Sequence, residues 1–171
     1  NEKSNMGLLH VANHHISPGK KQWTWGTGDF GKAWERNLTD EDGPYIELMT
    51  GVYTDNQPDF SWLQPYEEKF WAQYFMPYTE VGNVKNATKD VIVNLEVDGG
   101  TATITVYGTS KKGVTISLKN KTGGIIWSEK ADLSPETPFK KTVKQDSENR
   151  ENIMLTISTD DGSELLRYTT G

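Results

Sequence analysis

The stretch VIVNLEVDGGTATITV, residues 91–106, decides the fold of the carboxyl-terminal half of this chain. Apolar and polar side chains alternate on both sides of Asp98-Gly99-Gly100, which is the pattern of two half-buried strands joined by a tight hairpin. Further alternating segments, each set off by turn residues, follow at 114–118, 124–127, 139–143, 153–157 and 164–168. Seven short strands in about eighty residues predict an immunoglobulin- or fibronectin-like β-sandwich over residues 86–171.

The amino-terminal half, residues 1–85, also has the character of a β protein. Strands are expected at 7–12, 22–25, 45–53 and 69–77, with a short helical turn at 32–37. Because the segment 69–77 is rich in aromatic residues, we expect it to be packed on both faces. The sequence therefore predicts an all-β fold with a domain boundary after residue 85.

Composition restricts the classes of partner. The 171 residues carry a net charge of -6 and lysines occur at most in pairs, which disfavours nucleic acid as a partner. No apolar run is long enough for a membrane span. The absence of cysteine excludes disulfides, thiolate metal sites and cysteine nucleophiles. Localisation stays open between the bacterial cytoplasm and periplasm, and a first residue that is Asn suggests a trimmed chain.

The chemistry is concentrated in residues 10–62. This stretch holds all three histidines, four of the six tryptophans and many carboxylates, on a backbone interrupted by glycine and proline. Steady aliphatic periodicity, which a core would need, is weak here. A concave site for a polar ligand uses such a mixture of aromatic surface and hydrogen-bonding groups.

Two motifs in this stretch resemble cofactor-binding motifs, but their sequence context argues against cofactor binding. His10 and His14 would share a face of a helix, as zinc ligands can, but their neighbours favour a strand and a turn. Hydrogen bonding or proton transfer is the expected histidine role, and no metal is expected. The segment GTGDFG, residues 26–31, has dinucleotide-binding spacing without the buried strand and long helix that this motif requires. We expect a tight ligand-facing loop and no cofactor.

Tryptophans and one glutamate are the strongest ligand candidates. Trp23, Trp25 and Trp34 could form a platform for sugar rings, or could be ordinary packed aromatics. Glu47 lies between Ile46 and Leu48 in an expected strand, where a charge is costly unless it is paired or faces a cleft. Its pattern leaves open a structural ion pair and a general base.

The run HVANHHISPGKKQWTWGTGDFGKAWERNLTDEDGPYIELMTGVYTDNQPDFSWLQPYE, residues 10–67, resembles a known family. It is similar to the galactose-mutarotase-like domain of unknown function that precedes tetratricopeptide repeats in bacterial proteins. The resemblance implies that residues 1–85 are the terminal strands of a mutarotase-like β-supersandwich, followed by the small sandwich. In aldose mutarotases a late-strand glutamate before a Pro-Asp segment is the general base, which implies this role for Glu47, ahead of Pro58-Asp59.

These observations lead to a carbohydrate-binding or carbohydrate-processing protein, with a sugar or glycan as its partner. Whether it is an enzyme stays open, and the truncated chain is expected to be inactive without the rest of a longer parent chain with further repeats or domains. A non-enzymatic scaffold and a glycoside hydrolase pairing Glu47 with Asp29, Glu35 or Asp55 are the alternatives. The site residues are catalytic Glu47 and carbohydrate-binding His14, Trp23, Trp25, Asp29 and Trp34.

Overall fold

A computed structural model describes residues 3–55, 58–145 and 152–171. The chain forms two compact units, one of residues 1–11 with 75–171 and one of residues 12–74. The boundary after residue 85 is a division of the sequence pattern and stays a prediction.

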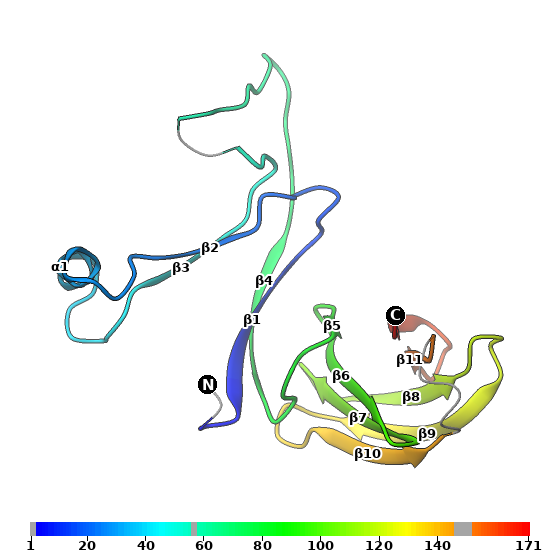
Figure 1. Cartoon of the computed structure of the whole chain (residues 1–171). Coiled ribbons are helices and arrows are strands. Elements are labelled where there is room, and N and C mark those ends of the chain that lie inside the picture. Colours follow the sequence, from blue (N-terminus) through cyan, green and yellow to red (C-terminus); the bar gives the residue numbers. More distant parts are fainter. Residues whose placement is uncertain (1–2, 56–57, 146–151) are drawn as a thin grey trace. The chain divides into compact units, whose positions relative to one another are not determined.

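The first unit contains a β-sandwich of two four-stranded antiparallel sheets (Figure 1). One sheet has the strand order β10 (Phe139–Lys144), β7 (Thr101–Gly108), β6 (Val91–Asp98) and β5 (Asn86–Ala87). The other has the order β12 (Glu164–Thr169), β11 (Met154–Thr159), β8 (Lys112–Lys119) and β9 (Ile125–Leu133). The all-β sandwich predicted from the alternating segments is confirmed, with β5 as a short additional strand.

The β6–β7 hairpin forms as its sequence predicts. Its two loop residues, Gly99 and Gly100, have φ values of 54° and 81°. Two successive positive φ angles match the twist of the flanking strands and are accessible to glycine at little cost. Leu95 consequently pairs with Ile104, and both point into the core.

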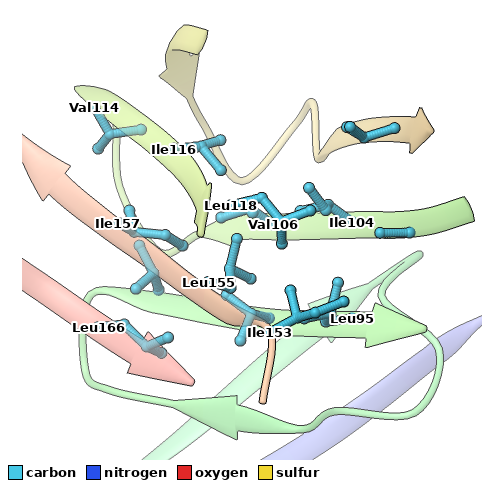
Figure 2. Packing of buried hydrophobic residues seen from close by; sticks show 14 of the residues in the cluster. Leu95, Ile104, Val106, Val114, Ile116, Leu118, Ile153, Leu155, Ile157 and Leu166 are labelled. Atoms are coloured by element: carbon cyan, nitrogen blue, oxygen red, sulfur yellow. The ribbon is translucent and has the colours of Figure 1, made fainter. Parts of the chain in front are cut away.

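The core lies between the two sheets (Figure 2). Ile116 and Leu118 of β8 and Leu155 and Ile157 of β11 are fully buried against residues of the facing sheet. Because strand side chains alternate between faces, β6, β7, β8 and β11 contribute every second residue to this core. The buried cluster comprises Val91, Val93, Leu95, Ala102, Ile104, Val106, Val114, Ile116, Leu118, Leu133, Val143, Ile153, Leu155, Ile157 and Leu166.

Two polar contacts join the open edges of the sandwich. Lys141 of edge strand β10 pairs with Glu129 of edge strand β9 at 2.7 Å. At the other seam, the Asn86 side-chain amide of β5 donates to the backbone carbonyl of Arg167 in β12 at 2.9 Å. Such contacts use edge groups that could otherwise pair with another chain.

A two-stranded sheet of β1 (Met6–Ala12) and β4 (Gln73–Thr79) lies mostly in the first unit. Met76 and Val81 pack on Ile92 and Tyr107, which lie on the faces of β6 and β7 that point away from the main core. The strand β6 is therefore buried on both faces along most of its length.

The second unit is built on the two-stranded antiparallel sheet of β2 (Lys21–Thr24) and β3 (Ile46–Met49), joined through helix α1 (Asp29–Leu38) (Figure 1). Among its described residues no large apolar side chain is buried. Hydrogen bonds hold part of it together: the Ser17 and Thr50 hydroxyls lie 2.9 Å apart, and the Gly19 amide donates to the Gly51 carbonyl. In the described part of the chain, no helix has the length and apolar character needed to cross a bilayer.

Three local predictions for residues 12–77 are wrong in extent. The strand expected at 45–53 is only β3, and the helical turn expected at 32–37 is the ten-residue helix α1. The segment 69–77 becomes a strand only from Gln73, and Phe70 is 77% exposed. Burial on both faces requires a layer on each side, and the described residues supply none for Phe70.

Candidate functional site

The β2–β3 pair brings Trp23 and Glu47 together. Their Cα positions are direct cross-strand partners, so both side chains leave the same face of the sheet. The neighbouring pair on this face is Lys21 and Met49, two residues along each strand. The two-residue period of each segment, together with this register, therefore places a tryptophan ring beside a carboxylate.

Tyr45 joins this pair from the residue immediately before β3. Its phenolic hydroxyl donates to Oε2 of Glu47 at 3.3 Å. Partial desolvation, followed by the charge of Glu47 and the hydrogen bond to it, raises the pKa of Tyr45 above its usual value of 10.0. The phenol is therefore a neutral donor at physiological pH, and it orients one oxygen of the carboxylate.

The Trp23 side chain is held at one edge and is partly exposed. Its indole Nε1–H donates to Sδ of Met49 at 3.1 Å, which orients the ring along the strand. The side chain is 41% exposed, and no ring or cation of the described residues stacks on it. Trp23, Tyr45 and Glu47 are hereafter called the ribbon site.

Glu47 is exposed, so the cost of burying a charge does not apply to it. We expected a charge between Ile46 and Leu48 to be buried and therefore paired or turned to a cleft. Ile46 is itself 55% exposed, because the two-stranded sheet has no buried apolar layer behind it among the described residues. The expectation of a buried charge is wrong, and the interest of Glu47 lies in its aromatic neighbours.

A second aromatic group, Trp25, Phe30 and Trp34, attaches helix α1 to the end of β2. Trp25 and Trp34 stack with ring centroids 4.9 Å apart and an interplanar angle of 12°, and Phe30 meets both rings edge-on. Each tryptophan therefore has one face covered by the other. Their packing role is evident, and only their outer faces remain for a ligand.

Glycine makes this attachment possible. Gly31 is buried in the first turn of α1, and a Cβ at this position would lie 2.2 Å from the Trp25 carbonyl oxygen and 2.6 Å from that of Gly26. The helix therefore approaches the backbone that follows β2 more closely than any side chain would permit. The segment 26–31 thus contains a helix start, and Asp29 lies in the first helical turn, where a negative charge is favourable.

His14 lies apart from these contacts. Its ring contacts that of His15, with centroids 3.9 Å apart, in the turn after β1. His10 instead stacks on Phe75 at 4.4 Å in the β1–β4 sheet. The ring contact of His14 is with its neighbour His15 and not with a ribbon-site residue, so sugar-binding roles for His14 and Asp29 stay predictions.

Metal and paired-carboxylate chemistry receive little support. Within residues 3–55, 58–145 and 152–171, no three His, Cys, Asp or Glu side chains are grouped to hold a metal ion. Asp55 is engaged locally, since its carboxylate accepts the Ser61 hydroxyl. Pairing of Glu47 with Asp29, Glu35 or Asp55 for hydrolysis stays a prediction.

Two surface hollows have linings that do not include the ribbon-site residues. One of about 320 Å³ is lined by α1 and the loop after it, with Lys32, Glu35, Arg36 and Asp40 among its residues. Another, of about 250 Å³ on the sandwich, is lined by Gly113, Lys130, Asp132 and Asp160. Both are lined chiefly by charged or small residues and lack the aromatic surface that a sugar ring would contact.

Each half of the chain matches a different family model. Residues 1–80 match a domain of unknown function, DUF5107, and residues 86–168 match the second domain of YphG-like proteins. No solved structure matches the chain. The ribbon site lies entirely in the first match. Neither description names a ligand, so the resemblance to mutarotase-like domains and the tetratricopeptide-repeat context stay predictions.

Sequence reasoning found two of the three ribbon-site residues. It selected Trp23 and Glu47 for their residue types but omitted Tyr45 from the candidate residues. The signal for Tyr45 was present, because Tyr45 and Glu47 are two residues apart and share a strand face. What the sequence could not supply was the register that sets Trp23 opposite Glu47.

Proposed function

We propose that this chain binds carbohydrate through the ribbon site. The single observation that carries the proposal is the cross-strand pairing of Trp23 with Glu47, which sets a partly exposed indole ring beside a carboxylate. The apolar C–H face of a sugar ring packs on such a ring, while the hydroxyl groups of the sugar donate to a carboxylate. The resemblance of residues 10–67 to mutarotase-like domains supports the same ligand class.

Tyr45 gives the site its orientation. Its hydroxyl holds Oε2 of Glu47 at 3.3 Å and leaves the other carboxylate oxygen to a ligand. A hydrogen bond to an ionised group is stronger than one between neutral groups, so a sugar hydroxyl bound here would be fixed in position. The ring packing and this hydrogen bond together select a ligand with one apolar face and a polar edge.

Catalysis by Glu47 stays a prediction beyond binding. A general base works best in a water-excluded site beside a second proton-transferring group. Glu47 is exposed and its described side-chain partner is Tyr45, so we expect little or no mutarotation or glycoside hydrolysis by this chain alone. Strong turnover by this chain, abolished in Glu47→Gln, would overturn that expectation.

The binding proposal is tested by titrating neutral oligosaccharides, chosen from a glycan array, into the chain. Trp23→Ala should weaken binding about tenfold, or ~1.4 kcal/mol, because the packing surface is lost. Trp71→Ala is the matched control: Trp71 also lies in residues 12–74 and is 43% exposed, against 41% for Trp23. Equal losses in the two variants would place binding elsewhere.

A non-enzymatic scaffold is the second candidate. The specific observation in its favour is the sandwich itself, whose buried core is formed by described residues of the first unit. If no glycan binds, or if every affinity survives both Trp23→Ala and Glu47→Gln, the scaffold becomes the better account.

A further inference from the structure

The carboxylate of Glu47 has no cationic partner in the described part of the chain. Ion pairs there engage other acidic residues, Glu67, Asp90, Asp160, Glu80, Glu129 and Glu164. Lys21 lies on the same sheet face as Glu47, diagonally across from it, but its amine donates to the backbone carbonyl of Asp55 at 3.3 Å. No side chain in residues 3–55, 58–145 and 152–171 thus forms an ion pair with the carboxylate of the ribbon site.

The unit around the ribbon site is strongly acidic. Residues 12–74 contain five lysines and arginines against ten aspartates and glutamates, which leaves -5 of the chain's net charge of -6. The summed charge of such a unit attracts cations over a distance of about 10 Å at moderate ionic strength. A cationic ligand would therefore be favoured both at Glu47 and on its approach.

The aromatic members of the ribbon site favour a cation as well. The face of an indole ring is the strongest cation–π acceptor among side chains, and a phenol ring is also effective. Trp23 is partly exposed and Tyr45 is held beside Glu47, so an ammonium group could contact the carboxylate and an aromatic face together. The site thus offers an aromatic face to C–H groups and a carboxylate to an amine. A ligand that carries both groups would use the whole site.

We propose that the preferred ligand of the ribbon site is an amino sugar, a saccharide that carries a free protonated amine. This inference rests on the proposed function, because it names the class of sugar that the same three residues select. Trp23 would contact the ring of the sugar and Glu47 its ammonium group. The hydroxyl of Tyr45 would hold the carboxylate in place.

The test uses three β-1,4-linked oligosaccharides of one length that differ only at C2. The free amine of chitosan oligosaccharide is replaced by an acetamide in chitin oligosaccharide and by a hydroxyl in cello-oligosaccharide. At about pH 6 and low salt, where ordinary carboxylates are ionised and sugar amines protonated, the amine form should bind about five- to tenfold more tightly than the others. Added salt should reduce this preference.

Two variants separate a local from a general effect of charge. Glu47→Gln should weaken binding of the amine form far more than binding of the neutral forms, and so remove the preference for the amine. Glu41→Gln changes the net charge of residues 12–74 by the same amount at an exposed position that is not part of the ribbon site, and it should leave most of the preference intact.

The outcomes distinguish the two proposals. Equal affinities for all three sugars, with no change in Glu47→Gln, would overturn the amino-sugar inference and keep carbohydrate binding. If the chain bound none of the three oligosaccharides and no other glycan, both the carbohydrate-binding proposal and the amino-sugar inference would be overturned. A lysine-rich peptide that competes as well as the chitosan oligosaccharide would overturn the inference in favour of a general cation site.

Discussion

Gly31→Ala tests whether α1 is held against the backbone after β2 by a contact that only glycine allows. In the structure the added Cβ would lie 2.2 Å and 2.6 Å from the carbonyl oxygens of Trp25 and Gly26. These are backbone atoms and cannot move aside as the end of a flexible side chain would. Because the clash opposes the close approach of the helix, Gly31→Ala should weaken the stack of Trp25 on Trp34.

The sign of the effect decides between two physical terms. Alanine is favoured over glycine inside a helix by about 1 kcal/mol, so without the clash the substitution would stabilise α1. Overpacking a close contact costs about 1–3 kcal/mol, and here two backbone oxygens are involved. We therefore expect a net loss and a helix that moves away from Trp25.

Far-UV circular dichroism measures this through the exciton signal of close indoles, since the centroids of the Trp25 and Trp34 rings lie 4.9 Å apart. Gly31→Ala should reduce that signal and leave the unfolding of the sandwich unchanged. The control is Gly28→Ala, because a Cβ at Gly28 meets no atom within 4 Å and Gly28 has a φ of -75°. An undiminished signal in Gly31→Ala would refute the reasoning.

Three further predictions concern the sandwich. Ile157→Ala should lower the free energy of unfolding, measured by urea titration, by about 2–5 kcal/mol because Ile157 is fully buried. The control Ile125→Ala, at a side chain that is 67% exposed, should change this free energy by less than about 0.5 kcal/mol. Asn120→Ala should cost about 1–2 kcal/mol, since its side-chain oxygen accepts three hydrogen bonds from the following turn; an unchanged urea midpoint would argue against that role. For Asp161, the hydrogen bond from Thr159 is the largest cause of a pKa below the usual 3.8. Its stabilisation is therefore present above pH 3.8 and lost as pH falls through the lowered pKa, so Asp161→Asn should flatten the acid limb of stability against pH, and an unaltered acid limb would contradict this.

The sandwich could be predicted because its signals are local. Between Val91 and Val106, alternation specifies which side chains are buried, and Gly99-Gly100 specifies the turn that sets the register. The same logic placed Leu155 and Ile157 in the core. Each strand of this half carries in its own residues the information that decides its face.

The second unit was harder because burial depends on layers that no single segment encodes. The apolar neighbours of Glu47 suggested a buried strand, but Ile46 is exposed, since the described residues place no layer against it. Phe70 was expected inside a strand for the same reason and lies outside one. Asp29 was expected in a loop because the glycines of residues 26–31 were interpreted as loop residues. Gly31 instead permits a close contact of α1 with the backbone, and this contact depends on the tertiary position of the helix.

Carbohydrate binding at the ribbon site is tested most directly by following the indole N–H resonances of the six tryptophans by NMR during titration with chitosan oligosaccharide. A Trp23→Phe variant assigns the signal of Trp23. The account predicts a saturable shift of that signal, because Trp23 lies beside Glu47 on an exposed sheet face, and little change at Trp127 in the sandwich. A Trp23 signal that stays fixed while binding is observed, or shifts confined to Trp127, would contradict it.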